Sequence, residues 1–126
     1  MKREISQEII MKLQMLEQQA NHLQQQLRAV EEGIVELQSL SLGVEELIGK
    51  TNKEIIAPIG NGIFAKAQLI SEELLVDIGS KNIVKKTIPE TKEIIAQQVR
   101  KLEKVKVEIQ ESLEEIKKEF EKIING

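Results

Sequence analysis

A repeat of apolar residues runs through the first third of the chain at alternating steps of four and three residues. It fills nine consecutive positions without a gap. An average step of 3.5 residues keeps one stripe of a helix turned toward a partner helix, as in a coiled coil. Only Gly33 lowers helix propensity within it, by about 1 kcal/mol relative to Ala. The pattern predicts a long helix that needs a partner, and its stripe, called the seam below, comprises Ile9, Leu13, Leu16, Ala20, Leu23, Leu27, Val30, Ile34 and Leu37.

The last third of the chain carries a seam of the same length. Its nine positions have one polar exception, Lys106, which we expect to reach out of the seam along its methylene stem. Two equal seams suit an antiparallel helical hairpin within one chain, with the two ends of the chain side by side. The second seam comprises Ile95, Val99, Leu102, Lys106, Ile109, Leu113, Ile116, Phe120 and Ile123.

The segment between the seams has a different pattern, in which β-branched residues flank short turns. Gly60-Asn61-Gly62 forms one turn and Gly79-Ser80-Lys81-Asn82 the other, and Gly and Asn tolerate the positive φ that hairpin turns need. Pro58 favours a strand edge or end, and Pro89 marks the start of the second helix. The expected strands cover residues 54–59, 63–70, 74–78 and 83–88.

The predicted fold class is α+β, mainly α. It consists of a long antiparallel coiled-coil hairpin with two central β-hairpins. We expect one domain with an N-terminal coiled-coil helix over residues 1–49, the two hairpins over 50–89 and a C-terminal coiled-coil helix over 90–126.

Composition argues against an enzyme, a metal site or a cofactor. There is no Cys, and the only His is His22, which is more simply a solvated side chain than a ligand. Gly60 and Gly62 lack the Gly-Lys-Ser/Thr that follows in a phosphate-binding loop, so turn geometry explains them. The net charge of −3, with no strongly basic arm, argues against nucleic acid as a partner. No apolar run suggests a signal peptide or membrane span, so we expect a soluble, cytoplasmic protein.

Four short strands bury little by themselves, and their open edges can pair with other chains. Assembly into an oligomer through the hairpins is therefore expected. The candidate interface residues are Ile55, Ile56, Ile59, Ile63, Phe64, Leu69, Leu75, Val76, Ile78, Ile83 and Val84.

The order of helix, two β-hairpins and helix, with a seam in both helices, resembles the α-class subunit of prefoldin, an archaeal and eukaryotic co-chaperone. The stretch from Ala57 to Ala67 is similar to that class's Pro-x-Gly-x-Gly turn and the strand after it. Leu75-Val76-Asp77-Ile78-Gly79 and Val84-Lys85-Lys86 resemble its second hairpin. One departure is Ser80-Lys81, where a second Gly is common.

The resemblance implies a hexamer of two α and four β subunits, whose hairpins form a β-barrel platform that carries six coiled coils. It also implies an ATP-independent holdase that binds unfolded or nascent client proteins at the coiled-coil tips, prevents their aggregation and delivers them to a group II chaperonin.

The ends of the chain should form such a tip. Ile10 and Ile124 fall outside the seam, where no partner helix would cover them, so a client-binding role is favoured for them, as it is for Ile5. The seam residues at the tip could equally serve only to close the coil. Met11 and Met15 could add adaptable contacts or could be ordinary helix-surface residues. The charge run over residues 114–122 reads as a solvated helix face. The candidate client-binding residues are Ile5, Ile9, Ile10, Phe120, Ile123 and Ile124.

A second function fits the same pattern. The chain could be a structural interaction protein that forms a homo-oligomer or a filament through its β segment.

Overall fold

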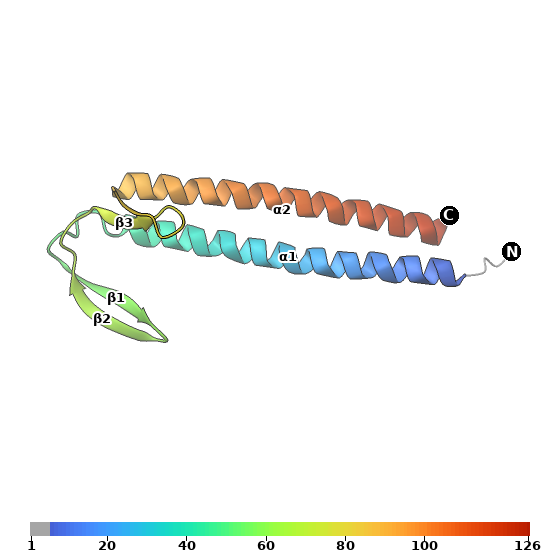
Figure 1. Cartoon of the computed structure of the whole chain (residues 1–126), viewed down its shortest axis with the longest axis horizontal. Helices are drawn as coiled ribbons and strands as arrows, with labels where there is room; N and C mark the ends of the chain where they lie inside the picture. The colour runs from blue at the N-terminus through green and yellow to red at the C-terminus, as the bar shows by residue number, and fades with distance from the viewer. Residues whose placement is uncertain (1–5) are drawn as a thin grey trace. The chain divides into compact units, whose positions relative to one another are not determined.

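The computed structural model describes residues 6–126, in which a long helix, two β-hairpins and a second long helix follow one another (Figure 1). This order and the mainly helical α+β class agree with the prediction. The elements are α1 (Gln7–Glu45), β1 (Glu54–Gly60), β2 (Ile63–Gln68), β3 (Leu74–Asp77), β4 (Ile83–Lys86) and α2 (Ile88–Asn125).

The chain divides into two compact units. The helix-pair unit comprises the described residues up to Val35 together with Arg100–Gly126, and the hairpin unit comprises Glu36–Val99. Both helices contribute to both units, whereas all four strands belong to the second.

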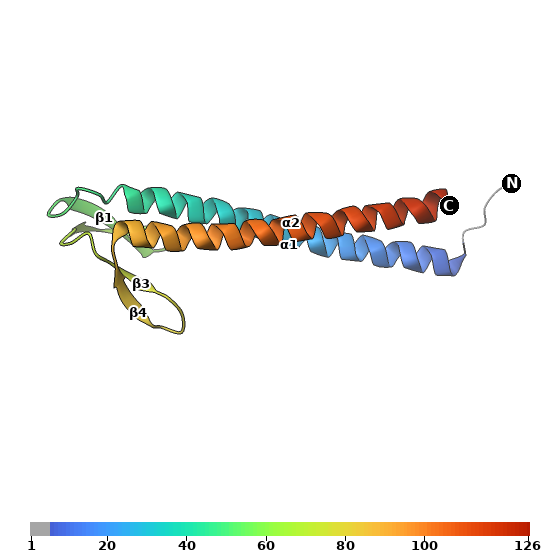
Figure 2. The same ribbon diagram turned by 90° about the horizontal axis from the view of Figure 1, so that it is seen from above.

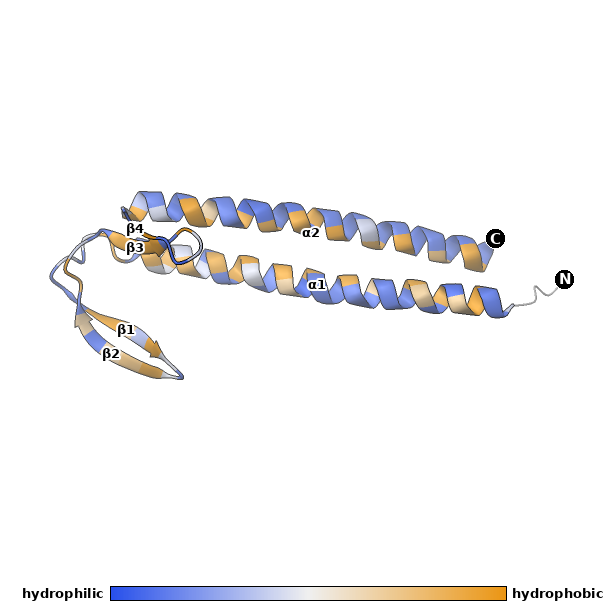
Figure 3. Ribbon diagram, viewed as in Figure 1, coloured by the Kyte–Doolittle hydropathy of each residue, from blue (hydrophilic) through white to orange (hydrophobic). Residues whose placement is uncertain are grey.

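In the helix-pair unit, α1 and α2 lie side by side and run antiparallel (Figures 1 and 2). Near the start of α1, Lys12 Nζ lies 4.0 Å from Glu119 Oε1, near the end of α2. Every predicted seam position in this unit is buried or half-buried, including Lys106, which confirms the coiled-coil stripe. Figure 3 shows the recurring apolar residues along both helices.

Gly33 has a packing role that its low helix propensity does not reveal. A Cβ added there would lie 3.2 Å from Cδ1 of Leu102 on the opposite helix. The missing side chain therefore makes room for Leu102, and this contact offsets part of the conformational cost of Gly.

The hairpin unit has a small core of its own, where Val44, Ile88 and Ile95 are buried. The first seam thus continues beyond Leu37 and the second begins before Ile95, so both are longer than predicted. Half-buried Ser41 and Lys92 interrupt the apolar pattern in these added parts. Partly buried Leu37, Leu47, Leu74 and Val99 pack against this core.

The β1–β2 hairpin has one half-buried face and one exposed face. Ile55 pairs with Ala67 and Ala57 with Ala65, and these four side chains are half-buried. The opposite face includes Ile56, Pro58 and Phe64, all exposed. A bulge follows Pro58, and Gly60, Asn61 and Gly62 have φ values of 140°, 51° and 78°, so the predicted positive-φ turn is confirmed.

The β3–β4 hairpin repeats this division. Val76 pairs with Val84 on the half-buried face, while Leu75 and Ile83 lie on the exposed face. Each hairpin is a separate two-stranded sheet, so within the described residues both strands of each sheet keep one unpaired edge.

The start of α2 differs from the prediction, because the helix begins at Ile88 and β4 already ends at Lys86. Thr87 and Glu90 form a reciprocal cap. Thr87 Oγ1 accepts a hydrogen bond from Glu90 N–H at 3.2 Å, and Glu90 Oε1 accepts one from Thr87 N–H at 3.1 Å. This arrangement is a capping box, which stabilises the first turn of α2 and so prevents β4 from extending further toward Ile88.

The cap also changes the electrostatics of Glu90. The hydrogen bond from the Thr87 backbone, then that with the Thr87 side chain, lowers the pKa of Glu90, and the nearby Lys86 acts in the same direction. Lys86 Nζ lies 4.0 Å from Glu90 Oε2.

Three other elements are shorter than predicted, and the smallest difference is in β3, which ends at Asp77 rather than at residue 78. α1 ends at Glu45, after which the backbone turns through i→i+3 hydrogen bonds toward Gly49 at φ 76°. β2 ends at Gln68, but Leu69 N–H still donates to the carbonyl of Lys53. Backbone pairing therefore continues through Leu69 and stops before Ile70.

Candidate functional site

The described residues offer little for catalysis or metal binding. Within residues 6–126, no group of three or more His, Asp or Glu side chains could hold a metal ion. His22 is exposed, and its Nε2 lies 3.2 Å from Nε2 of Gln26, whose amide can donate a hydrogen bond. The notable features are exposed apolar side chains, which occur near the ends of the helices, on the hairpins and at single positions within the helices, such as Val35 and Val107.

No helix in the part of the chain that the structure describes is both long and apolar enough to cross a membrane.

The predicted tip residues divide into two groups. Ile9, Phe120 and Ile123 are half-buried on the seam, where they close the end of the coiled coil. Ile10 and Ile124, by contrast, expose 44% and 54% of their surface. We call this end of the helix-pair unit, with its five residues, the tip. Ile5 lies outside the described residues.

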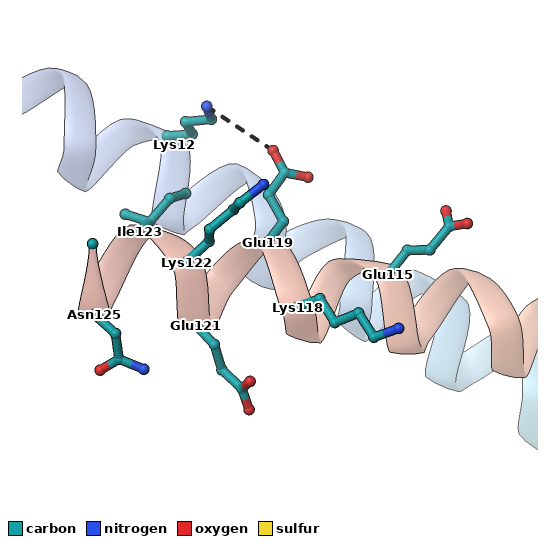
Figure 4. A pocket seen from close by; sticks show the side chains of 9 residues that line it. Lys12, Glu115, Lys118, Glu119, Glu121, Lys122, Ile123 and Asn125 are labelled. Atoms are coloured by element: carbon teal, nitrogen blue, oxygen red, sulfur yellow. Dashed lines mark ion pairs between the residues drawn. The ribbon is translucent and has the colours of Figure 1, made fainter.

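A pocket next to the tip has a mainly charged lining (Figure 4). In the close-up, Ile123 points toward α1, whereas Glu121 and Asn125 point away from it. Its lining residues are Lys12, Glu115, Lys118, Glu119, Glu121, Lys122, Ile123, Asn125 and Gly126.

Lys12 is the lining residue that sequence reasoning missed. Its ion pair with Glu119 crosses from α1 to α2, and both side chains are at least half exposed. The pairing depends on the register between the two helices. An apolar repeat has the same pattern in every heptad, so it cannot specify that register. The sequence did contain one signal for this ion pair: Lys12 and Glu119 have opposite charges and belong to the ends of two helices that were predicted to lie together.

The predicted interface residues on the hairpins are mostly open to solvent. All of them belong to the hairpin unit. The exposed ones are Ile56, Ile59, Ile63, Phe64, Leu75, Ile78 and Ile83, and the half-buried ones are Ile55, Leu69, Val76 and Val84.

Four exposed apolar residues of the hairpin unit were not predicted as interface: Leu40, Leu42, Ile48 and Ile70. Ile48 lines a second pocket with Ser71, Thr87, Ile88 and others at the start of α2. Ile70 was predicted to be the last residue of a strand, whereas in the structure β2 ends at Gln68 and Ile70 lies outside it. All four add to the exposed apolar residues of the hairpin unit.

Comparison with known proteins gives a consistent result. The sequence matches the family model described as "Prefoldin subunit" over residues 16–125. A protein of Methanobrevibacter smithii named "Prefoldin subunit alpha" is 34% identical over 97 residues, which are 76% of this chain and 66% of the relative. The same name is carried by a protein of Methanosphaera stadtmanae, 25% identical over 70% of this chain and 64% of its own length.

A third relative, "Prefoldin subunit alpha 1" of Methanocaldococcus jannaschii, is 26% identical over 86% of this chain and 75% of its own length. The matched part of the chain thus spans just under two thirds of the first two relatives and three quarters of the third. The family model covers most of the sequence, including both hairpins, the second seam and the first seam from Leu16 onward, so this chain belongs to the prefoldin subunit family.

Proposed function

We propose that this chain is an α-class chaperone subunit that assembles with β-class subunits into an α2β4 hexamer in the cytoplasm. The assembly binds unfolded or nascent proteins at the tips of its coiled coils, keeps them from aggregating and passes them to a group II chaperonin. It acts without ATP or another cofactor and without catalysing a reaction.

The observation that carries the proposal is the pair of exposed isoleucines at the tip. Ile10 and Ile124 lie on different helices of the helix-pair unit and have no helix covering them. A holdase must bind apolar segments weakly and reversibly, and several such tips in one assembly bind a chain more tightly than one does. The half-buried Phe120 and Ile123 would extend the contact where the coil ends.

The exposed hairpin faces support the assembly step. Ile56 and Phe64 lie on one face of β1–β2, and Leu75 and Ile83 lie on one face of β3–β4. Exposed apolar patches of this kind mark protein interaction surfaces, and open strand edges add hydrogen-bonding groups. The family and the names of the relatives favour prefoldin subunits as the partners.

The test is an aggregation assay with guanidine-denatured citrate synthase. The chain is mixed with a β-class subunit, and light scattering is followed. Deleting residues 1–10 and 119–126 should abolish suppression of aggregation while native mass spectrometry still finds the hexamer. Val107→Gln, at an exposed α2 position away from the tip, serves as the matched control and should retain suppression. Retained suppression by the truncated hexamer would refute the tip as client site.

The unpaired strand edges also favour a second function, a structural homo-oligomer or filament. Native mass spectrometry of the purified chain, alone and mixed with a β-class subunit, separates the two. A hexamer that forms only on mixing supports the chaperone subunit, whereas large assemblies of the chain alone support the structural protein.

A further inference from the structure

Two methionines lie exposed on α1 close to the tip. Met11 exposes 67% of its surface and Met15 exposes 59%, although both belong to the helix-pair unit in which every seam position is covered. They are four residues apart, so they lie on one face of the helix, one turn above the other. At about 100° per residue, Met11 lies nearly opposite the seam residues Ile9 and Leu13.

This placement leaves both thioether sulfurs accessible to dissolved oxidants. The sequence has no Cys, Trp or Tyr, so the methionines are its main sites of two-electron oxidation. Met1 is the third and lies outside the described residues. A buried methionine would be protected by packing, but neither Met11 nor Met15 is part of the seam.

The chemistry is a simple oxygen transfer. A peroxide delivers one oxygen atom to the thioether sulfur as its O–O bond breaks, and the other oxygen leaves as water. The sulfur loses two electrons and becomes a sulfoxide. The product is polar, whereas the thioether is apolar and adaptable, as suits contact with varied apolar segments.

We propose that Met11 and Met15 are an oxidation site through which peroxide weakens client binding at the tip. The inference rests on the proposed function, because the regulated event is the capture of an apolar segment of a non-native protein. Met11 directly follows exposed Ile10, about 100° around the helix from it, so the methionine pair lies beside Ile10 near the tip. Because neither side chain packs in the seam, oxidation leaves the helix pair folded.

The experiment treats the purified chain with hydrogen peroxide, removes the peroxide with catalase, and then adds an untreated β-class subunit. Peptide mass spectrometry follows the addition of one oxygen to Met11 and Met15, with the Met1 peptide measured separately. Both should oxidise at a rate within roughly threefold of free methionine, as exposed thioethers do. The helical circular dichroism and the subunit stoichiometry of the hexamer should not change, and its mass should rise only by the added oxygen atoms.

Client capture is then measured with guanidine-denatured citrate synthase. Oxidation should weaken capture by roughly threefold, because two apolar contacts become polar. The double variant Met11→Leu/Met15→Leu keeps an apolar surface and should capture equally well before and after peroxide. Met11→Gln/Met15→Gln should show the weakened capture without any peroxide.

Three results would overturn the inference: oxidation of Met11 and Met15 more than about tenfold slower than free methionine, unchanged capture by a hexamer in which both methionines of this chain are fully oxidised, or an equal loss in the leucine variant. An untreated hexamer that captures nothing would instead refute the proposed function, and the regulatory role with it. The mass measurement would still decide whether the two sulfurs are the oxidation site.

Discussion

The helix pair and the β-hairpins of this chain use apolar residues in opposite ways. In the helix-pair unit, each apolar stripe is covered by a stripe of the same chain, and Leu16, Ile34 and Ile109 are buried. In the hairpin unit, Ile56, Phe64 and other strand residues stay exposed. Both regions are rich in branched aliphatic residues, so composition does not explain the difference.

The difference lies in the availability of a partner. Two helices of nearly equal length cover each other when the chain folds back, as the antiparallel contact of Lys12 with Glu119 illustrates. A two-stranded sheet has two faces, and one chain covers only one of them here. Isolated hairpins of this kind are marginally stable in water. The apolar stripes of the helix pair are thus covered within the chain, whereas the exposed faces of the hairpins are left available for contact with other chains.

The largest expected effect tests whether the seam is a true core. Ile95→Ala removes a buried side chain that packs with Val44 and Ile88, and it should lower the free energy of unfolding by about 3 kcal/mol. Urea unfolding followed by circular dichroism measures the loss. Val107→Ala, at an exposed α2 position, should change it by less than about 0.5 kcal/mol. Equal losses in the two variants would contradict the division between covered and uncovered residues.

The next effect tests the hairpins as an interface. Phe64→Lys places a charge on the exposed face of β1–β2 and should weaken assembly with a β-class subunit by about 2 kcal/mol or more. Helix content should stay the same, because Phe64 is not part of the core. Sedimentation of the mixture measures the assembly.

Val35→Lys is the matched control for Phe64→Lys. It adds the same charge at an exposed α1 position and should leave assembly intact. If both variants assemble normally, the exposed face of β1–β2 is not the contact surface.

The smallest effect tests the junction where hairpin turns into helix. Thr87→Ala removes one half of the reciprocal cap and should cost about 1 kcal/mol of stability. The thermal transition measures it. Thr51→Ala, in an exposed turn outside the cap, provides the control, and an equal cost there would show that the cap adds nothing.

The cap also predicts a pH dependence. The pKa of Glu90 is lowered in the folded chain, chiefly by the hydrogen bond from the Thr87 backbone, so its carboxylate stabilises the fold above its unfolded pKa. This contribution is lost as the pH falls through the lowered, folded pKa. The stability difference between the native chain and Glu90→Gln should therefore narrow in acid. A difference that stays constant with pH would contradict the role of the carboxylate.

Much of the fold could be read from local pattern. The 3.5-residue repeat predicted both helices, and the Gly-Asn-Gly turn predicted the first hairpin, because spacing and φ preference are local properties. The start of α2 was also readable: Thr87 and Glu90 have the spacing of a capping box, but the β-branched residues before Pro89 suggested a longer strand.

The candidate sites were less accessible to sequence reasoning. A repeat marks which residues lie off the stripe, and so it singled out Ile10 and Ile124. It does not give the register between two helices, so the pairing of Lys12 with Glu119 and the contact of Gly33 with Leu102 remained hidden. Both depend on how far one helix slides along the other.

The sequence by itself determined the order of elements, the covered stripe of each helix and the positions of the turns, because each follows from periodicity or from the allowed φ of single residues. Only the tertiary structure decided which apolar residues of the hairpins remain exposed. Ile56 and Ile55 are neighbours of the same type, yet only one of them is half-buried. The physical reason is that burial depends on what lies against a face, and strand alternation fixes the two faces without saying which one is covered.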